Sequence, residues 1–457
     1  MQAHHEAALD LAKLEKNNAI GTPKRNDPPD IEKLLKALRP ASGPPIPFLD
    51  IAPSLYLFTA RLYRTALDRG IRDLLFLSRE GQILKQMFDF HQTVHRHTGV
   101  IRTHYLKVSR RSTFLLSLGV LAAETFDILF RQYRRMSISD FLKSLDLADH
   151  AASLCAALGV DMARFDAIKD DLPNDPDFKI LLELPLFQDI YETQRVDRSQ
   201  AFHRYLTSVL GVTALPDTLA LVDVGWVGTI QDNLCKWIAK EHRPDIQIDG
   251  YYLGLAAPGD LSANNRKHGL LYAYTERDDH TYRVFSEHRS LFEIVLHADH
   301  GSARRYVLDD RGAPVVVEDD SPEKRMLIEN VQPVSRAIFD YFRRLSTALA
   351  HKPHFERELP EATLRRHARM AFHPTTNEIE WVKNLSHSEN FGLFGDTRFY
   401  DPNEAAATLF SRMRFTWTLL FRRRTFFRPI LWPWLTIKTQ ALPGTSTLYV
   451  WFRHLRH

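Results

Sequence analysis

Hydrophobic and polar positions follow a helical period over the first long patterned stretch of the chain. From Phe48 to Arg69, apolar residues recur every three or four positions, as at Leu55, Phe58 and Leu62. This spacing places them on one face of a helix. Gly70 follows directly, and glycine is the residue that most often ends a helix. The stretch therefore predicts an amphipathic helix that packs against a larger core.

Five short stretches then predict strands. The apolar run at Leu219–Val222 is typical of a strand buried in a parallel sheet. The other candidate strands lie at Asp73–Leu77, Thr103–Val108, Gln247–Leu255 and 270–274.

Helical patterns separate and follow these strands. The longest covers Ser112 to Leu210 and predicts a helical insertion between two strands of one sheet. Tyr306 to Val317 predicts a hairpin, and 322 to about 390 is again helical in pattern. We expect an α/β fold, with a parallel Rossmann-like sheet, a large helical insertion and a helical C-terminal region.

Changes of pattern and composition divide the chain into six parts. The expected parts are an N-terminal arm or linker (1–46), the first part of the α/β core (47–111), a helical insertion (112–215), the second part of the core (216–320), a helical region (321–410) and a basic aromatic C-terminal segment (411–457).

Composition narrows the class of protein and its cellular compartment. Of the 457 residues, 44% are hydrophobic and 25% charged, values typical of a globular protein with a large core. The two cysteines, Cys155 and Cys235, have no metal-type spacing and make no disulfide framework. The N-terminus lacks the apolar stretch of a signal peptide, and no uncharged apolar run approaches the roughly 18 residues of a membrane span. We expect a cytoplasmic protein.

The segment 411–457 differs from the rest of the chain. It holds nine Lys or Arg, no Asp or Glu, and four of the seven tryptophans. Arginines attracted to anionic headgroups, with indole rings at the interface, predict peripheral contact with the inner face of the cell membrane. Packing of the aromatic residues in the core and nucleic-acid binding are the alternatives. We expect no nucleic-acid partner.

The stretch LALVDVGWVGTIQDNL, from Leu219, predicts a ligand site. An apolar strand ends at Asp223, Gly225 and Gly228 flank a turn, and Thr229 is a candidate helix cap. In open α/β folds, a phosphorylated ligand binds where a strand meets a glycine loop and a helix N-terminus. The alternative is an ordinary buried strand with an aspartate-capped turn.

A second strand–loop–helix unit supplies positive charge. Arg79 and Gly81 follow the strand that ends at Leu77, and Arg110 and Arg111 follow the next strand. Arginines at the carboxyl ends of parallel strands suit a phosphate or diphosphate. Surface ion pairs are the alternative. Glu293 lies among apolar residues of a predicted helix. It is either a buried or site-facing carboxylate or an exposed acidic residue of that helix.

Three segments together resemble a known family. LLFLSREGQIL, THYLKVSRRS and LVDVGWVGTIQDNL are similar to bacterial polysaccharide-cluster proteins labelled predicted HAD-superfamily hydrolases. The similarity runs from about Pro47 to Tyr306, with Glu80 where the family has Asp. A HAD phosphatase needs an Asp-x-Asp strand end, whose second acid donates a proton. Here Gly225 stands at that second position, after Asp223.

The same layout looks like a type I phosphoribosyltransferase. The resemblance implies that Arg79 to Gly81 form a diphosphate loop and that Asp223 to Thr229 hold the ribose 5-phosphate of phosphoribosyl pyrophosphate. Such enzymes show two adjacent acids, whereas Val222 precedes Asp223 here. The resemblance further implies Mg²⁺ as cofactor, with Asp223 at the metal.

Three functions follow as expectations. The first is transfer of ribose 5-phosphate from a phosphorylated sugar donor to a lipid-linked glycan acceptor. In it, Asp223, Arg79 and Glu293 are catalytic, and phosphate is bound by a set of glycines and polar residues: Gly81, Arg110, Arg111, Gly225, Gly228 and Thr229. The second is a HAD-like sugar-phosphate hydrolase. The third is a non-catalytic partner in polysaccharide assembly.

Overall fold

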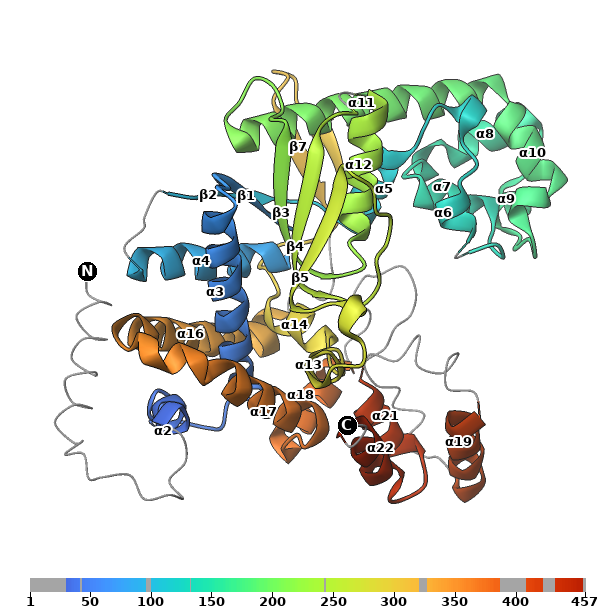
Figure 1. The fold of residues 1–457 in the computed structure, drawn as a ribbon. Coiled ribbons are helices and arrows are strands. Elements are labelled where there is room, and N and C mark those ends of the chain that lie inside the picture. Colours follow the sequence, from blue (N-terminus) through green and yellow to red (C-terminus); the bar gives the residue numbers. More distant parts are fainter. Residues whose placement is uncertain are drawn as a thin grey trace, which may run out of the picture.

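Five parallel strands form the central sheet, in the order β2-β1-β3-β4-β5 (Figure 1). The structure is a computed structural model that describes residues 30–41, 43–95, 100–131, 133–241, 244–319, 327–386, 408–421 and 432–454. The strands are β1 (Asp73–Leu77), β2 (Arg102–Leu106), β3 (Thr218–Trp226), β4 (Gln247–Leu255) and β5 (Asn265–Tyr272). This confirms the predicted α/β fold with a parallel Rossmann-like sheet.

The strand predictions were right in place and partly wrong in length. Strands β1 and β4 begin and end as predicted, whereas β5 begins at Asn265 rather than at 270. Strand β3 does not end at Val222, because it stays paired with β4 as far as Trp226. Asp223 therefore lies within the strand, and Gly225 is a strand residue rather than part of a turn.

Both faces of the sheet are buried. Leu74 and Phe76 of β1 pack on one side, and Leu75 and Leu77 pack on the other. This is the alternation that a strand covered on both faces requires. The helices of the first layer are α3 (Ala52–Asp68), α4 (Glu80–Val94), α16 (Gln332–His351) and α17 (Leu359–Phe372). Those of the second are α11 (Pro185–Leu210) and α12 (Thr229–Glu241).

The insertion between β2 and β3 is helical, as predicted, and has its own core. That core is rich in phenylalanine, including Phe126, Phe141 and Phe178. Its helices are α5 (Arg110–Ser117), α6 (Asp127–Phe130), α7 (Ile138–Ser144), α8 (Ala151–Leu158), α9 (Met162–Asp166) and α10 (Pro176–Glu183), followed by α11. Figure 1 shows the insertion projecting sideways from the sheet.

Helix α11 joins the two cores. Its 26 residues span roughly 39 Å at 1.5 Å per residue. Phe187 and Tyr191 pack in the insertion, while Phe202 and Leu206 pack on the sheet. The insertion is therefore held to the sheet by a continuous rigid element.

The segments after the sheet lie near its carboxyl edge. They are α13 (His280–Phe285), α14 (Ser290–Val295) and an antiparallel hairpin, β6 (Ala303–Leu308) and β7 (Pro314–Glu318). The hairpin predicted around 309–312 is thus confirmed. The C-terminal region is helical: α16, α17, α18 (Thr376–Ser386), α19 (Leu409–Phe421), α21 (Pro433–Gln440) and α22 (Thr445–His454).

The predicted N-terminal arm contains helix α2 (Asp30–Ala37). Ile31 and Leu35 of this helix are fully buried, and Leu35 O accepts a hydrogen bond from Tyr341 Oη at 2.7 Å. The first 29 residues of the predicted arm lie outside the described residues. Among the helices that the structure describes, none combines the length and the apolar character needed to cross a membrane.

Candidate functional site

The order of the strands marks one position at the edge of the sheet. Strand β1 lies between β2 and β3, so the chain reverses direction across the sheet at the β1–β3 pair. These two strands pair only at Leu75 with Leu221 and at Phe76 with Val222. Ligands of open α/β sheets bind beyond the carboxyl ends of the strands at such a switch point.

Asp223 lies directly at this point. It follows the last residue of β3 that pairs with β1, and its side chain is buried. The Val224 N–H donates to Asp223 Oδ1 at 2.8 Å. Burial raises the pKa of Asp223 well above its usual value, and the charge of Glu80 raises it further. The Val224 amide and Arg110 oppose this rise only in part.

Glu293 of α14 lies at the same place. Trp226 Nε1–H, at the end of β3, donates to Glu293 Oε1 at 2.7 Å. Burial raises the pKa of Glu293, and Glu80 raises it further, while Arg110, Trp226 and Arg289 lower it. Glu80, the first residue of α4, therefore acts electrostatically on both Asp223 and Glu293. The structure brings three carboxylates together from β3, α4 and α14.

One of the predicted arginines acts on these carboxylates. Arg110 begins α5 and lowers the pKa values of both Asp223 and Glu293, whereas Arg79 precedes α4 and acts on the pKa of His297. Within the described part of the chain, neither guanidinium forms a hydrogen bond or an ion pair. Two cations without protein acceptors at the ends of neighbouring strands, one half-buried (Arg79) and one exposed (Arg110), are suited to an anionic ligand.

The residue before Arg79 adopts a rare backbone conformation. Ser78 has φ 62°, in the left-handed region, directly after β1. Such a conformation is unfavourable for a residue with a side chain, and it is found preferentially at ligand sites. It turns the chain sharply out of the strand and into α4. Arg79 and Glu80 are thereby placed at the strand's end.

Arg111 does not belong to this group. Its Nη2 donates to Lys143 O at 3.0 Å and to Asp146 Oδ1 at 3.4 Å. Successive helical residues point about 100° apart, so Arg110 and Arg111 face different surroundings. The sequence predicted one anion site from this pair, and the structure divides the pair between two places.

The predicted phosphate-binding glycines have different roles. A Cβ at Gly225 would lie 2.1 Å from Gly254 O, so a glycine is needed for β3 to approach β4. Gly81 is needed in a similar way against the backbone of Phe76. Gly228, with φ +78°, forms the turn into α12, and its carbonyl accepts from the Asp232 N–H at 3.0 Å.

Thr229 is the first residue of α12 rather than its cap. The first amide groups of a helix have no partner within the helix and carry partial positive charge. The turn at Gly228 therefore leads into an N-terminus of the kind that binds phosphate. Of the predicted glycines, Gly228 is the one whose turn leads directly to this N-terminus.

A buried lysine holds this turn in place. Lys267 Nζ of β5 donates to Val227 O at 2.9 Å and to Pro258 O at 3.1 Å. It also forms an ion pair of 2.6 Å with Asp232, and both side chains are buried. Sequence reasoning missed Lys267, because no local pattern connects it with a turn 40 residues away.

Further contacts close the site from the other side. Gln82 Nε2 donates to Asp299 Oδ1 at 3.1 Å, and Tyr105 Oη is 2.6 Å from His300 Nε2. The segment after α14 thus contacts the first turn of α4 and the end of β2. His297 is buried here, and its pKa is lowered to about 3 by burial and by the charges of Arg79 and His300.

The chemistry of the donors fits a divalent cation bound together with its ligand. Asp223, Glu80 and Glu293 repel one another, and a cation would relieve that repulsion. Among the described residues, no group of three or more His, Cys, Asp or Glu side chains is arranged to hold a metal ion alone. Mg²⁺ commonly uses one or two carboxylates together with substrate phosphates.

Fold and site define an α/β protein with a mixed acidic and basic site at the switch point of its sheet. The chain matches no known family model. A search of curated proteins finds no similar sequence.

Proposed function

We propose that this protein transfers a ribosyl 5-phosphate group from phosphoribosyl pyrophosphate to a hydroxyl of a glycan acceptor. The observation that carries the proposal is that carboxylates and arginines occur together at the β1–β3 switch point. Three carboxylates, Asp223, Glu80 and Glu293, lie within electrostatic reach of one another and of Arg110, and Arg79 directly precedes Glu80; neither guanidinium has a partner among the described residues. A phosphorylated sugar presents matching chemistry, with hydroxyls for the acids and phosphates for the arginines.

Each group has a role in the proposed reaction. The amides after Gly228, at the start of α12, hold the 5-phosphate. Asp223 faces the ribose hydroxyls and the Mg²⁺ that accompanies the diphosphate; when bound, that ion spreads the diphosphate's negative charge. Arg79 and Arg110 stabilise the charge that develops on the departing diphosphate.

Glu293 is the proposed general base. The acceptor hydroxyl gives its proton to Glu293, its oxygen bonds to C1 of the ribose, and the C1–O bond breaks with its electron pair going to the diphosphate. A carboxylate with a raised pKa is a better base than an ordinary one at neutral pH. The hydrogen bond from Trp226 fixes its orientation.

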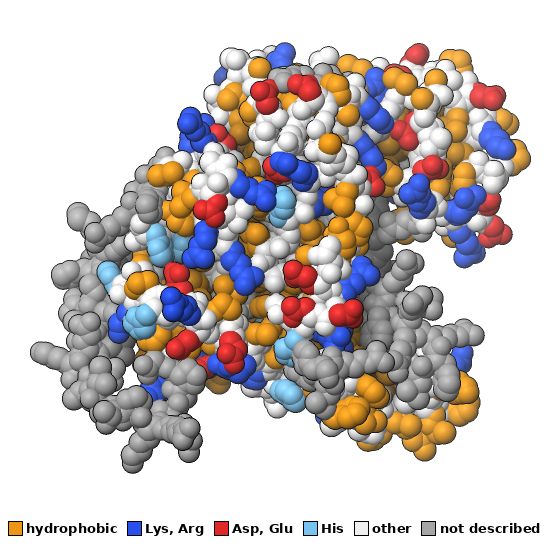
Figure 2. Space-filling model, in the orientation of Figure 1, with side chains coloured by type: hydrophobic (Ala, Val, Ile, Leu, Met, Phe, Trp, Pro, Cys, Tyr) orange, Lys and Arg blue, Asp and Glu red, His pale blue; other side chains and the backbone are white. Residues whose placement is uncertain are grey.

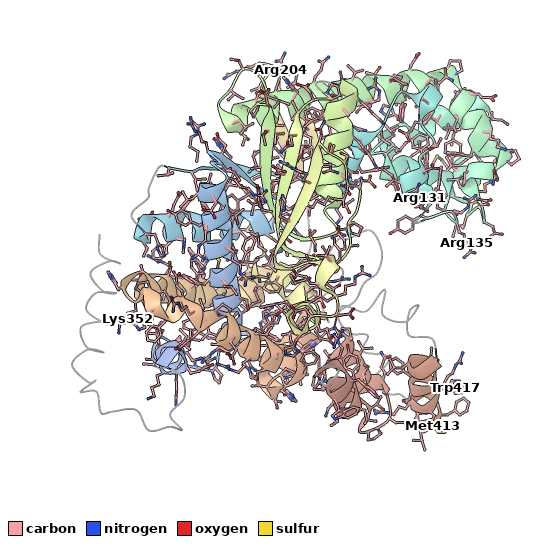
Figure 3. All side chains as sticks on the ribbon, in the orientation of Figure 1. Arg131, Arg135, Arg204, Lys352, Met413 and Trp417 are labelled. Atoms are coloured by element: carbon pink, nitrogen blue, oxygen red, sulfur yellow. The ribbon has the colours of Figure 1, made fainter. Side chains whose placement is uncertain are left out.

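The C-terminal segment supports a lipid-linked acceptor. Trp417 of α19 and Trp451 of α22 are 57% and 55% exposed, and Phe410, directly before the segment on α19, is 77% exposed. Figure 2 shows hydrophobic side chains gathered over these helices, and Figure 3 shows Met413 and Trp417 pointing outward from α19. Exposed aromatic rings on a basic segment without acids are suited to an anionic membrane surface.

Other parts of this segment pack on the core. Trp432 is buried against His288, and Trp432 Nε1–H donates to Ala371 O at 2.9 Å. From the sequence, membrane contact was the prediction for the whole segment, and core packing was an alternative. The exposed faces of α19 and α22 remain the part available for membrane contact.

Titration with phosphoribosyl pyrophosphate and Mg²⁺, followed by thermal unfolding, tests the proposal. Ligand at one hundred times its Kd stabilises the folded chain by about 2.7 kcal/mol. Arg79→Gln should weaken this effect strongly. Arg135→Gln should leave it unchanged, because Arg135 is an exposed residue of the insertion (Figure 3). If phosphoribosyl pyrophosphate with Mg²⁺ does not raise the unfolding temperature of the unaltered protein, it is rejected as the donor.

Product analysis separates the transferase from the alternative functions. Diphosphate release that depends on a glycan acceptor supports transfer. Release of inorganic phosphate from sugar phosphates without an acceptor would favour the HAD-like hydrolase, with Glu80 as the acid near Asp223. Folded protein that binds no phosphosugar would favour the non-catalytic assembly partner.

A further inference from the structure

Four arginines surround one buried aspartate beside the candidate site. Asp146 follows α7, and its side chain has no exposed surface. Arg304 and Arg305 of β6 lie 2.6 and 3.1 Å from its carboxylate oxygens, and Arg111 of α5 lies 3.4 Å away. Arg198 of α11 lies 3.9 Å away and donates to Asp146 O at 3.1 Å.

The backbone is shaped to bring these side chains together. Arg304 and Arg305 are neighbours on a strand, where side chains normally alternate between faces. The β6–β7 pairing shifts register between Ala303 and Arg305, and such a bulge re-aims a side chain. Asp146 itself has φ 58°, in the left-handed region. Two local irregularities thus meet at one cluster.

The cluster carries more positive charge than its acids balance. Only Asp146 and Asp319, 3.7 Å from Arg111, pair with the four guanidiniums in the described residues. Two positive charges are left over. Burial lowers the pKa of Arg198 to about 10 against the attraction of Asp146, and the charges of Arg305 and Arg111 lower it further.

Hydrogen bonding is also incomplete. The Nε atoms of Arg111, Arg198 and Arg305 are buried and have no acceptor among the described residues. Arg198 as a whole is only 5% exposed. Buried donors without acceptors are unfavourable, most of all on charged groups. If the cluster served only to hold the insertion on the sheet, one or two arginines would be enough to pair with the single carboxylate of Asp146. Four arginines exceed that structural need.

We propose that this arginine cluster (Arg111, Arg198, Arg304 and Arg305) is a second anion site, which binds the diphosphate or phosphate group of a ligand. The side chains of Arg111, Arg304 and Arg305 are 26%, 35% and 31% exposed, so a solute reaches them. Planar guanidiniums bind phosphate oxygens in pairs of hydrogen bonds.

The site adjoins the candidate active site. Arg110 and Arg111 are successive residues of α5, and the first acts on Asp223 while the second joins the cluster. The cluster therefore lies where α5, the insertion and strand β6 meet, next in sequence to the arginine that acts on Asp223. The inference rests on the cluster itself and does not require ribosyl transfer.

Isothermal titration of the full chain with sodium diphosphate, without Mg²⁺, tests the inference. Arg305→Gln should weaken one binding event by at least about tenfold, because a hydrogen bond to a charged group contributes about 1.5–3 kcal/mol. Arg204→Gln is the matched control on α11: among the described residues its side chain bonds to Gly312 O at 2.9 Å, and Figure 3 shows it at the end of α11 that lies away from the insertion. It should bind as the unaltered chain does.

The outcomes separate this site from the proposed active site. If the arginine cluster and the proposed active site both bind diphosphate, the unaltered chain shows two binding events. Arg305→Gln then loses one of them and Arg79→Gln loses the other. If the proposed function fails, the event sensitive to Arg305 remains. Absence of diphosphate binding, or equal binding by Arg305→Gln and the unaltered chain, overturns the inference. Should Arg305→Gln not fold, as judged by circular dichroism, Arg111→Gln decides by the same criterion.

A second ligand identifies the source of the anion. Farnesyl diphosphate carries the same diphosphate on a short lipid. If it competes with diphosphate for the event that depends on Arg305, the site serves a lipid-linked acceptor. If only free diphosphate binds there, the site serves a soluble phosphorylated ligand.

Discussion

Replacement of Lys267 by methionine should destabilise the protein strongly, because it removes one partner of a buried ion pair. The lysine and aspartate side chains are 1% and 9% exposed, and the Lys267 Nζ–Asp232 distance is 2.6 Å. All three ammonium donors are used, on Asp232, Val227 O and Pro258 O. Breaking such a pair costs about 3–5 kcal/mol, since it leaves a buried charge without its counterion.

The structure places the expected loss near the lower end of that range. Asp232 would keep the Asn265 side-chain amide at 2.8 Å and the Asp260 N–H at 3.1 Å. We therefore expect a loss of about 3 kcal/mol in the free energy of unfolding. That is a large share of the roughly 5–15 kcal/mol typical of a domain.

Urea unfolding followed by circular dichroism measures this loss. Lys236→Met is the matched control on the same helix as Asp232, because the Lys236–Asp260 ion pair of 2.8 Å is 38% and 62% exposed. Exposed pairs contribute at most about 1 kcal/mol. The double variant Lys267→Met with Asp232→Leu should recover most of the loss, since no buried charge remains. A Lys267→Met loss no larger than that of the control would refute the reasoning.

Three further predictions concern the site. In metal-free buffer, Asp223→Asn should stabilise the protein increasingly as pH rises. The native state holds the Asp223 proton more tightly than the unfolded state does, because the native pKa is raised. The free energy of unfolding of the unaltered chain therefore falls between the usual aspartate pKa and the raised native pKa, by up to about 1.4 kcal/mol per pH unit. Urea midpoints from pH 4.5 to 8 test this, and a constant difference contradicts it. Trp226→Phe removes the 2.7 Å hydrogen bond to Glu293, so the acid limb of the activity profile should move to higher pH; an unmoved limb excludes Glu293 as the base. Gly225→Ala should destabilise by on the order of 2–6 kcal/mol, because its Cβ would meet Gly254 O at 2.1 Å on a backbone with φ +124°, and near-native stability in a thermal scan would contradict that close approach.

Local pattern predicted the positions of the five sheet strands and the limits of two of them. The apolar runs at Asp73–Leu77 and Gln247–Leu255 predicted β1 and β4 with their observed limits. The long helical stretch between β2 and β3 and the hairpin near 309–312 were also predicted. Periodicity decides such features, because it depends on which neighbouring side chains are apolar.

The end of β3 was beyond local pattern. Two glycines in the sequence predicted a turn at Gly225. Across the sheet, however, Gly254 offers a backbone with no side chain, and β3 continues because the two strands approach closely there. A glycine permits both outcomes, and the partner strand decides between them.

The sequence by itself determined the parallel sheet, its helical insertion and the presence of acids and arginines at the ends of the strands. Only the tertiary structure decided which charges meet. It separated Arg110 from Arg111, placed Glu293 on Trp226 and joined Asp146 to arginines as many as 159 positions away. Apolar periodicity is a local property of the chain, whereas charge interactions depend on distances in space that only packing sets.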